Sequence, residues 1–392
     1  MSRTDRAVAD PVIVAAARTA VGTSYRGSLA NTSVQDLATW VLAETIRRSG
    51  LSPDLIDDVI FADSGAARWA AMENGLMNVP GQSVGRACAG SLTAIGNAAG
   101  SIKSGMDSAI IAGGVYSAST APRMMQRVPG TADEWAPAPP MIHPISDEAP
   151  SQEVSITVGH STAVEAGLTR EEMDAWAYRS HMRAVAAIDA GMFNDEIFAI
   201  KVTAADGTVT EFAVDEHPRR GTSMEKLASL KVLHPEIENF QITAGNSSGV
   251  NDGAAAVAIT SPELAAAEGL VPMAKVKAWC SAAVHPGRTG FGALEATKLI
   301  LKRSGYSVDD IALWEINEAF ASVPIAVTKT LGIDDERVNI FGSGCSIGHP
   351  ISASGARMIN TLVYELQRRG GGLGVASMCA AAGQGGAVLI EV

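Results

Sequence analysis

One cysteine stands where a nucleophile would be expected, directly before a predicted helix. Cys88 lies in Arg86-Ala87-Cys88-Ala89-Gly90-Ser91, and the apolar residues that follow it recur at helical spacing. The free N–H groups and the positive end of the dipole at a helix start stabilise a thiolate. Cys88 is therefore a candidate nucleophile, with a buried cysteine that packs under the helix as the alternative.

A histidine in a glycine-rich segment is the candidate base. The segment Gly342-Ser343-Gly344-Cys345-Ser346-Ile347-Gly348-His349-Pro350 precedes another helical pattern. It is not G-x-G-x-x-G, because its third glycine falls one place late, so a dinucleotide site is only weakly indicated. A histidine between glycine and proline suits a general base on a rigid loop. A surface histidine without a role is the alternative.

Two strand ends carry groups that could reach the same site. Asn317-Glu318 interrupts an apolar run at the end of a predicted strand, where the pair either caps the next helix or faces a pocket. Cys379 ends another predicted strand and leads into a glycine-rich turn. Open α/β sheets gather their sites at strand–loop–helix junctions, so these strand ends join Cys88 and His349 as one candidate constellation.

The elements that position these residues repeat along the chain. Residues 48–56 and 303–311 are identical at six of nine positions, at an offset of 255. In both copies a helical pattern (residues 37–48 and 293–303) comes first, a glycine ends it and a β-rich run follows. Downstream, a helical pattern and then a buried strand follow in both halves. This alternation predicts two similar βαβ halves built around parallel sheets.

The region between the two copies differs in composition. Residues 119–150 are rich in proline, methionine and alanine, which disfavours continuous secondary structure. An amphipathic helix is predicted from about residue 170 to residue 190, followed by an irregular, charged stretch to about residue 233. We interpret residues 119–249 as a lobe inserted between two duplicated halves.

Composition argues against several classes of protein. The 392 residues are 47% hydrophobic and 18% charged, which allows a large core. The net charge is −12 and no basic stripe stands out, so no nucleic-acid partner is expected. No apolar run is long enough to cross a membrane and the polar start is no secretory signal, so a cytoplasmic protein is expected. The four cysteines form no C-x-x-C pair, so Cys280 and Cys345 are expected to be small buried hydrophobes.

The chain resembles the thiolases, the family of acetyl-CoA acetyltransferases and 3-ketoacyl-CoA thiolases. Its most specific stretches are Ala244-Gly245-Asn246-Ser247-Ser248-Gly249-Val250-Asn251-Asp252-Gly253-Ala254, Asn317-Glu318-Ala319-Phe320 and Gly348-His349-Pro350. The resemblance implies an α/β fold with a duplicated five-layer αβαβα core and an inserted loop domain. The expected domains are an N-terminal half in residues 1–118, completed by about residues 250–270, a CoA-binding loop domain in residues 119–249, and a C-terminal half in residues 271–392.

The resemblance also implies a role for each candidate residue. Cys88 matches the nucleophile that carries the acyl group as a thioester, and His349 matches the base that activates it. Cys379 matches the cysteine that moves a proton at the substrate α-carbon. Asn317 matches the residue that holds an oxyanion-hole water beside the histidine. The backbone N–H groups of Cys88 and Ala381 would form the second oxyanion hole.

Coenzyme A and acyl-CoA are the implied substrates, with no metal and no other cofactor. Arg219 matches a residue that packs on the CoA adenine, and Ser248 matches one near the pantetheine arm. Because the net charge would repel anionic CoA, binding is expected to rely on local positive charges such as Arg219, Arg220 and Lys226. The implied activity is reversible thiolytic cleavage of 3-ketoacyl-CoA, or Claisen condensation of acyl-CoAs, by a homodimer or homotetramer.

Two departures from the family pattern bear on strain and substrate. The glycines after the second cysteine are Ala380-Ala381-Ala382-Gly383 here, and alanine is strained wherever φ must be positive. Thr157-Val158-Gly159 and residues 289–293 replace segments that shape the acyl pocket in the family. We therefore expect a bulkier or branched 3-ketoacyl-CoA to be preferred over acetoacetyl-CoA.

Two other functions stay open at this point. Gly245-Asn246-Ser247-Ser248-Gly249 fits the G-x-S-x-G of serine hydrolases, but that motif needs a helix directly after the serine. Asn251-Asp252-Gly253 follows instead, which indicates a turn. A catalytically altered, thiolase-like CoA-binding protein is the second alternative, although no expected catalytic residue is missing.

Overall fold

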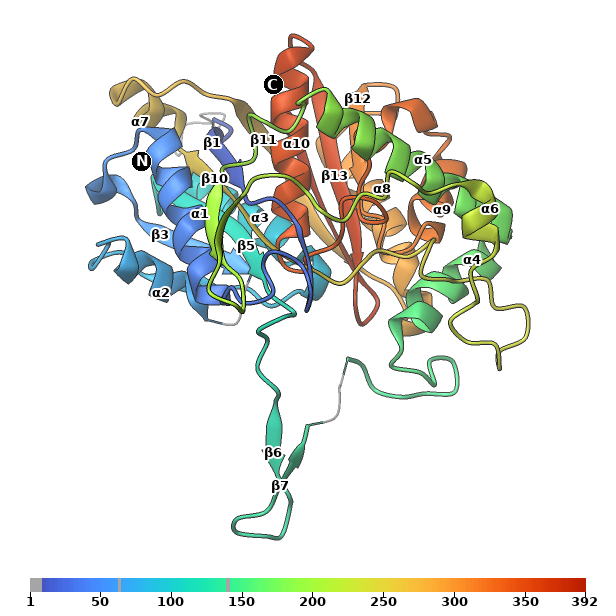
Figure 1. The fold of residues 1–392 in the computed structure, drawn as a ribbon. Helices are drawn as coiled ribbons and strands as arrows, with labels where there is room; N and C mark the ends of the chain where they lie inside the picture. Colours follow the sequence, from blue (N-terminus) through green and yellow to red (C-terminus); the bar gives the residue numbers. More distant parts are fainter. Residues whose placement is uncertain (1–8, 63–64, 139–141) are drawn as a thin grey trace.

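A mixed ten-stranded sheet forms the frame of the computed structural model, which describes residues 9–62, 65–138 and 142–392 (Figure 1). The strand order is β12-β13-β14-β11-β1-β10-β5-β3-β4, and β2 pairs with β10. Most of the polar start, together with Pro139 and Pro140, lies outside the described residues. The strands of this sheet are β1 (Val12–Arg18), β2 (Gly22–Thr23), β3 (Asp58–Ala62), β4 (Gly81–Ser83), β5 (Ala109–Tyr116), β10 (Asn251–Thr260), β11 (Ala274–Ala283), β12 (Ile311–Ile316), β13 (Leu373–Ala380) and β14 (Gln384–Glu391).

The two halves of the sheet have the same pairing pattern. In the first half, β3 is parallel to β4 and β5, and β10 is antiparallel to β5 and β1. In the second half, β12 is parallel to β13 and, through one isolated bridge, to Val338, while β14 is antiparallel to β13 and β11. The halves meet where Val12 of β1 pairs antiparallel with Lys275 of β11. The duplication expected from the sequence is confirmed.

The prediction of parallel pairing is wrong for part of each half of the sheet, where the strands pair antiparallel. The strands β13 and β14 are separated only by residues 381–383. A connection that short permits only antiparallel pairing, whereas a parallel pair needs a long crossover. The βαβ pattern holds for the first strands of each half and does not extend to the return strands.

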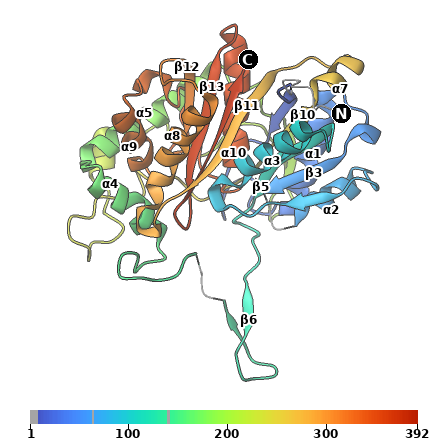
Figure 2. The ribbon, with the colours of Figure 1, turned by 180° about the vertical axis from the view of Figure 1, so that it is seen from behind.

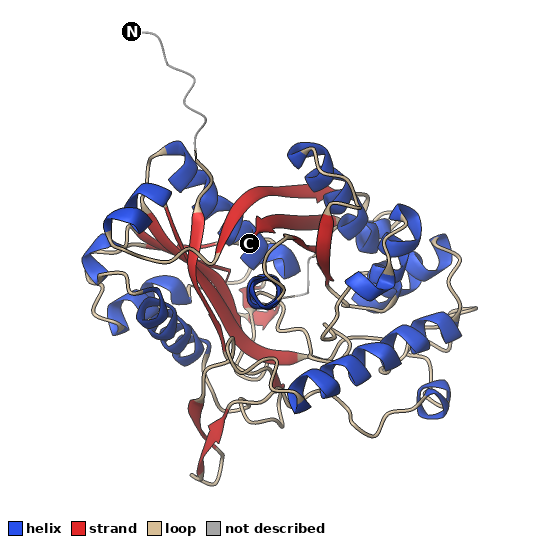
Figure 3. Cartoon of the chain, turned by 90° about the horizontal axis from the view of Figure 1, so that it is seen from above, coloured by secondary structure: helices blue, strands red, loops and turns tan. Residues whose placement is uncertain are grey.

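Three layers of helices cover and separate the two halves (Figures 1, 2 and 3). One buried apolar cluster lies between β1, β3 and β5 and the outer helices α1 and α2, and a second lies between β12 and β14 and the outer helices α8 and α9. The third surrounds α3 and α10, which pack against each other and against strands of both halves. This is the expected order of five layers. The helices of these layers are α1 (Val34–Ser49), α2 (Ala66–Glu73), α3 (Gly90–Ser104), α8 (Gly292–Ser304), α9 (Ser322–Leu331) and α10 (Ser354–Arg368).

The repeated sequence match marks the ends of two equivalent helices. Helix α1 ends at Gly50 and α8 ends at Gly305, and both glycines adopt the left-handed conformation, with φ of 69° and 78°. Glycine takes this conformation without the steric cost that a Cβ atom imposes, so it stops the helix and turns the chain toward the next strand. The repeated sequence therefore corresponds to the glycine that ends the helix in each half.

Parts of residues 119–249 pack against the cores of both halves, while one hairpin stands apart. The hairpin of β6 (Met125–Arg127) and β7 (Trp135–Pro137) projects from the body, as Figure 1 shows. Phe193, Ile197 and Phe212 pack into the core of the first half, while Met173 and Ile242 pack into that of the second. The predicted helix is confirmed as α5, but the stretch that follows is only partly irregular. The remaining elements of the region are α4 (Ser161–Glu165), α5 (Arg170–Asp189), β8 (Ile200–Thr203), β9 (Val209–Phe212) and α6 (Met224–Ala228), and α7 (Pro262–Ala267) follows β10.

Helix lengths and hydropathy bear on membrane insertion. Within the described ranges, no helix is both long and apolar enough to cross a bilayer.

Candidate active site

One cavity of about 390 Å³ brings together residues from four distant segments of the chain. Cys88, His349 and Cys379 line it, and so do Ala381 and Ser248. Asn317 is fully buried directly behind His349. The sequence predicted that Cys88, Asn317, His349 and Cys379 would converge from strand–loop–helix junctions. The other lining residues are Ala87, Ile142, Glu153, Val154, Ser155, Val158, Leu233, Ser247, Gly249, Val250, Ala319, Phe320 and Ile351.

Cys88 sits in a tight turn directly before α3. The turn spans Ala87–Ala89, and Ala87 has a φ of 42°, a conformation that is strained for a residue with a side chain. The backbone N–H groups of Ala381 and of Cys88 itself face the sulfur and lower its pKa, as expected at a helix start. Burial outweighs them and raises the pKa of Cys88 to about 11. The resting nucleophile is thus a thiol that needs a base.

His349 is held in the tautomer that a base requires. Ser354 donates its hydroxyl hydrogen to the carbonyl oxygen of Pro350, at 3.0 Å. Its oxygen lies 2.6 Å from Nδ1 of His349, so it accepts the Nδ1–H. Nε2 then carries the free lone pair. Burial, followed by the charge of Arg357, lowers the pKa of His349 to about 4, so the imidazole is neutral at physiological pH.

The loop before His349 fits closely against β10. The backbone N–H of His349 donates to Oδ1 of Asn251, at 3.0 Å. Gly348 has a φ of 108°, and a Cβ atom there would lie 2.5 Å from the Asn251 side chain. Both facts require glycine at this position. The glycine of the Gly-His motif therefore sets the backbone path that aims the imidazole.

Asn317 places its amide beside the imidazole. It follows β12, and its Nδ2 lies 3.5 Å from Nε2 of His349. This orientation turns an N–H toward the ring lone pair and leaves Oδ1 buried without a hydrogen-bond partner among the described residues. The next helix, α9, has Ala321 as its N-cap. Asn317 therefore does not cap that helix, and it lies behind His349 without itself lining the cavity.

Cys379 and the turn after it form the opposite wall. Cys379 is only 2% exposed at the end of β13, and burial together with the nearby Cys88 sulfur raises its pKa. In the turn, Ala382 has a φ of 67°, whereas Ala381 is not in the left-handed region. The expected strain therefore falls on Ala382. The N–H of Ala381 keeps its direction toward Cys88.

Glu318 accepts hydrogen bonds from four buried groups, a role that no sequence motif predicts. Its carboxylate accepts hydrogen bonds from Nε1 of Trp176 (2.9 Å), Oγ of Ser180 (2.6 Å), Nδ2 of Asn339 (2.9 Å) and the backbone N–H of Cys345 (3.1 Å). It thereby ties α5 and the glycine-rich loop to the strand end that carries Asn317. These partners are distant in sequence, so no local motif could have revealed them.

The expected CoA contacts are only partly brought together. Ser248 lines the cavity, but Arg219 lines a separate hollow of about 390 Å³ with Arg26 and Glu216. His217 connects the two, because it also lines that hollow and contacts Gly249 of the cavity wall. Of the other expected positive charges, Arg220 pairs with Asp189, and Lys226 donates to the carbonyl oxygen of Gly221.

The departures at the acyl pocket have unequal consequences. Val158 lines the cavity, and it belongs to the π-helical turn Ser155–His160. Residues 289–293 do not line it. Gly290 packs behind the wall instead, where a Cβ atom would lie 1.9 Å from Oγ1 of Thr162. Only the first segment can therefore contact an acyl chain directly.

The remaining candidates have structural roles. Cys280 and Cys345 are buried, and their thiols face the carbonyl oxygens of Ala296 and Glu318. Ser247 donates to the carbonyl oxygen of Thr243. The serine hydrolase is excluded because strand β10, and not a helix, follows the motif. The turn predicted at Asn251 is wrong, because Asn251 is the first residue of that strand.

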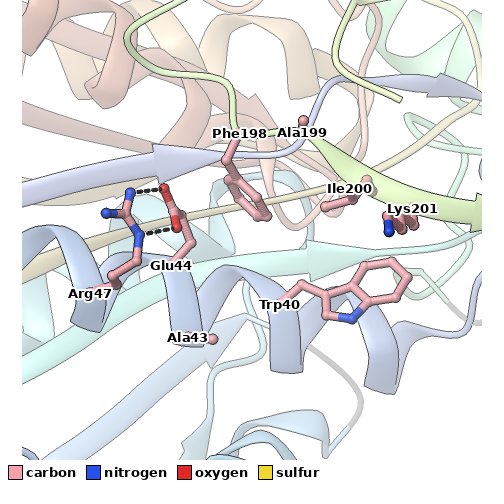
Figure 4. A pocket seen from close by; sticks show the side chains of 8 residues that line it. All are labelled: Trp40, Ala43, Glu44, Arg47, Phe198, Ala199, Ile200 and Lys201. Atoms are coloured by element: carbon pink, nitrogen blue, oxygen red, sulfur yellow. Dashed lines mark hydrogen bonds and ion pairs between the residues drawn. The ribbon is translucent and has the colours of Figure 1, made fainter. Parts of the chain in front are cut away.

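Two other features, metal-ligand clusters and a hollow beside α1, do not provide a competing site in the described part of the chain. In the described part of the chain, no group of three or more His, Cys, Asp or Glu side chains could hold a metal ion. A hollow of about 420 Å³ lies between α1 and residues 198–201 (Figure 4). It is lined by Trp40 and Phe198 and by the ion-paired Glu44 and Arg47, and it contains no cysteine or histidine.

Comparisons with known proteins agree with this geometry. Residues 11–263 match the N-terminal domain of thiolase, and residues 270–392 match its C-terminal domain. The chain is 39% identical to an acetyl-CoA acetyltransferase of Pseudomonas aeruginosa, over 97% of this chain and 99% of that one. It is 36% identical to a 3-oxoadipyl-CoA/3-oxo-5,6-dehydrosuberyl-CoA thiolase of Escherichia coli, over 95% and 97%. The crystal structure of human mitochondrial 3-ketoacyl-CoA thiolase superposes with a TM-score of 0.90 at 32% identity, over 98% and 99%.

Proposed function

The chain belongs to the thiolase family and is an acyltransferase, and from this premise we propose that it cleaves 3-ketoacyl-CoA through an acyl group on Cys88. The observation that carries the proposal is the single cavity lined by Cys88, His349, Cys379 and Ala381. Two thiols and one neutral imidazole are what a thiolytic cleavage needs: a nucleophile, its base and a second acid–base group.

In the first half-reaction, the sulfur of Cys88 attacks the 3-keto carbon while its proton passes to Nε2 of His349. The bond between C2 and C3 then breaks. C2 takes the proton of Cys379, and acetyl-CoA leaves. The enzyme now carries a thioester on Cys88, an imidazolium at His349 and a thiolate at Cys379.

In the second half-reaction, the thiol of CoA attacks the thioester carbonyl and gives its proton to the Cys379 thiolate. The sulfur of Cys88 leaves and recovers its proton from His349. The shortened acyl-CoA is released with every group in its starting state. The reverse sequence is the Claisen condensation.

Two sets of hydrogen-bond donors support the oxyanions of these steps. The N–H groups of Cys88 and Ala381 already face the sulfur, so they are placed for the oxygen of the thioester. The amide of Asn317 and the imidazole of His349 lie together at the other side. A water held by Asn317 is the donor that the family resemblance implies for the second oxygen.

Substrate binding follows from the same placement. Ser248 is proposed to contact the pantetheine arm, because it lines the cavity. Arg219 is proposed to pack on the adenine from the adjoining hollow. The reaction needs no metal or further cofactor, and CoA is a substrate. The domain boundaries expected from the sequence, near residues 118, 249 and 270, and a cytoplasmic location are also retained as proposals.

A homodimer or homotetramer is proposed for the assembled enzyme. The hairpin of β6 and β7 projects from the body (Figure 2). Its apolar side chains are exposed, Met125 by 48% and Trp135 by 60%. Exposed apolar groups on a projecting arm are typical of an interaction surface. Sedimentation of the protein and of a variant without residues 125–137 tests this role.

A product assay tests the activity itself. The protein is incubated with CoA and a series of 3-ketoacyl-CoAs, and acetyl-CoA and the shortened acyl-CoA are measured by chromatography. We expect both products in equal amounts. Binding of acyl-CoA without either product would instead support the alternative of a catalytically altered CoA-binding relative.

A further inference from the structure

The composition of the cavity wall bears on which acyl chains it accepts, a question that rests on the proposed function. We propose that the cavity favours acyl chains with an uncharged end and disfavours chains that end in a carboxylate, and that Glu153 sets this preference. The similarity to a thiolase named for 3-oxoadipyl-CoA makes the distinction worth testing, since adipyl chains end in a carboxylate.

Large apolar side chains make up much of the cavity wall, which also includes Ser155, Ser247, Ser248 and His349. Seven large apolar side chains contribute to it: Ile142, Val154, Val158, Leu233, Val250, Phe320 and Ile351. Among the described residues that line the cavity there is no lysine and no arginine, and Glu153 is the only carboxylate. A chain that ends in a methyl group meets matching apolar surface. A chain that ends in a carboxylate meets a like charge and no partner cation.

Glu153 is fixed to the wall by its neighbours. Its carboxylate oxygen Oε1 accepts the backbone N–H of Ser155, at 3.1 Å, and its carbonyl oxygen accepts Oγ1 of Thr157, at 3.2 Å. These contacts anchor it to the same turn that presents Val158 to the cavity. Glu153 is exposed, and the contact with Ser155 holds its charge at the rim of the cavity.

The size of the effect follows from the size of the cavity. A sphere with the cavity's volume of about 390 Å³ is roughly 9 Å across, which sets the scale of the separation between Glu153 at the rim and a carboxylate inside the cavity. At an effective dielectric constant of about 20, repulsion over that distance changes an equilibrium on the order of tenfold. Loss of water from the substrate carboxylate against the apolar wall acts in the same direction.

Two substrates of equal length isolate the terminal charge. 3-Oxohexanoyl-CoA and 3-oxoadipyl-CoA both carry six-carbon acyl chains, and they end in a methyl group and a carboxylate respectively. The readout is the ratio of their kcat/KM values. We expect the wild type to favour the methyl-ended substrate by tenfold or more. We expect Glu153→Gln to reduce that ratio on the order of tenfold, and Glu153→Lys to reduce it further.

Matched controls separate charge from damage to the fold. Gln retains the oxygen that accepts the Ser155 N–H, and thermal unfolding checks that each variant is folded. Glu268→Gln removes an exposed charge at the C-terminal end of α7, outside the cavity lining, and should leave the ratio unchanged. A wild-type ratio near one, or equal ratios for wild type and Glu153→Gln, would overturn the proposal while leaving the thiolase activity intact. Failure to cleave either substrate would overturn the proposed function itself.

Discussion

Replacing Ser354 by alanine should slow acylation of Cys88 although Ser354 lies outside the cavity lining. Its hydroxyl is the group that accepts the Nδ1–H of His349, at 2.6 Å, and it is 1% exposed. Without it, the imidazole keeps a buried N–H with no acceptor at that position. The ring can relieve this by placing its proton on Nε2 instead, where it can no longer accept the proton of Cys88.

The expected magnitude comes from the cost of an unpaired buried donor. Leaving a buried N–H without a partner costs about 1–3 kcal/mol. Because about 1.4 kcal/mol corresponds to a tenfold change in rate, the acylation rate should fall by about 5- to 150-fold. Since Ser354 positions His349 and does not touch the substrate, KM should change much less than kcat.

Rapid-quench measurement of acyl transfer from acetyl-CoA to the enzyme gives the acylation rate directly. Ser352→Ala is the matched control, because Ser352 lies two residues before Ser354 in the chain. The Ser352 hydroxyl has no hydrogen-bond partner in the described part of the chain. Thermal unfolding of both variants checks the fold. An acylation rate of Ser354→Ala within twofold of wild type would refute the tautomer argument.

Four further outcomes are expected. Ala382→Gly should stabilise the protein by roughly 0.5–1 kcal/mol, because relief of a left-handed alanine exceeds the added entropy of the unfolded chain; urea unfolding measures this, and a loss of stability would contradict it. His349, His181 and His217 have pKa values lowered to about 4, 3 and 4, chiefly by burial, so the unfolded chain binds more protons below pH 6.5. These histidines should therefore lower the unfolding free energy as the pH drops from about 6.5 to 4, by about 1.4 kcal/mol per pH unit for each, while Glu315, whose pKa burial raises to about 7, offsets one of them above about pH 4.5; a flat profile would contradict this. Cys379→Ala should still be acylated but turn over roughly 10²- to 10⁴-fold more slowly, and unchanged turnover would remove this thiol from the mechanism. In a series from C4 upward that includes branched chains, kcat/KM should rise beyond acetoacetyl-CoA in graded steps of about 1–3 kcal/mol per methylene, whereas a clear maximum at C4 would refute the pocket argument.

The fold was largely predictable because its signals are local and occur twice. Gly50 and Gly305 end equivalent helices, and the apolar spacing before each predicts helices that differ from α1 and α8 by a few residues at most. The antiparallel strands β10 and β14 have no comparable local signal in the sequence. Their pairing depends on the length of a turn such as residues 381–383, which a helix–strand alternation does not specify.

The catalytic residue types of the site were predictable from the sequence. The residues that position them were not. Cys88, His349 and Cys379 stand at ends of predicted elements, where the sequence can be interpreted directly. Glu318 and Ser354 act through contacts that only the folded chain creates or orients. The pKa of Cys88 shows the same limit, because the helix start predicted a lower value and burial, a property of the whole fold, raises it.

The central claim is that Cys88 carries the acyl group. Brief exposure to an acyl-CoA, followed by proteolysis and peptide mass spectrometry, locates the adduct. We predict an acylated peptide that contains Cys88, and none that contains Cys280 or Cys345, whose thiols are buried outside the cavity. An adduct confined to Cys280 or Cys345, with Cys88 unmodified, would contradict the account.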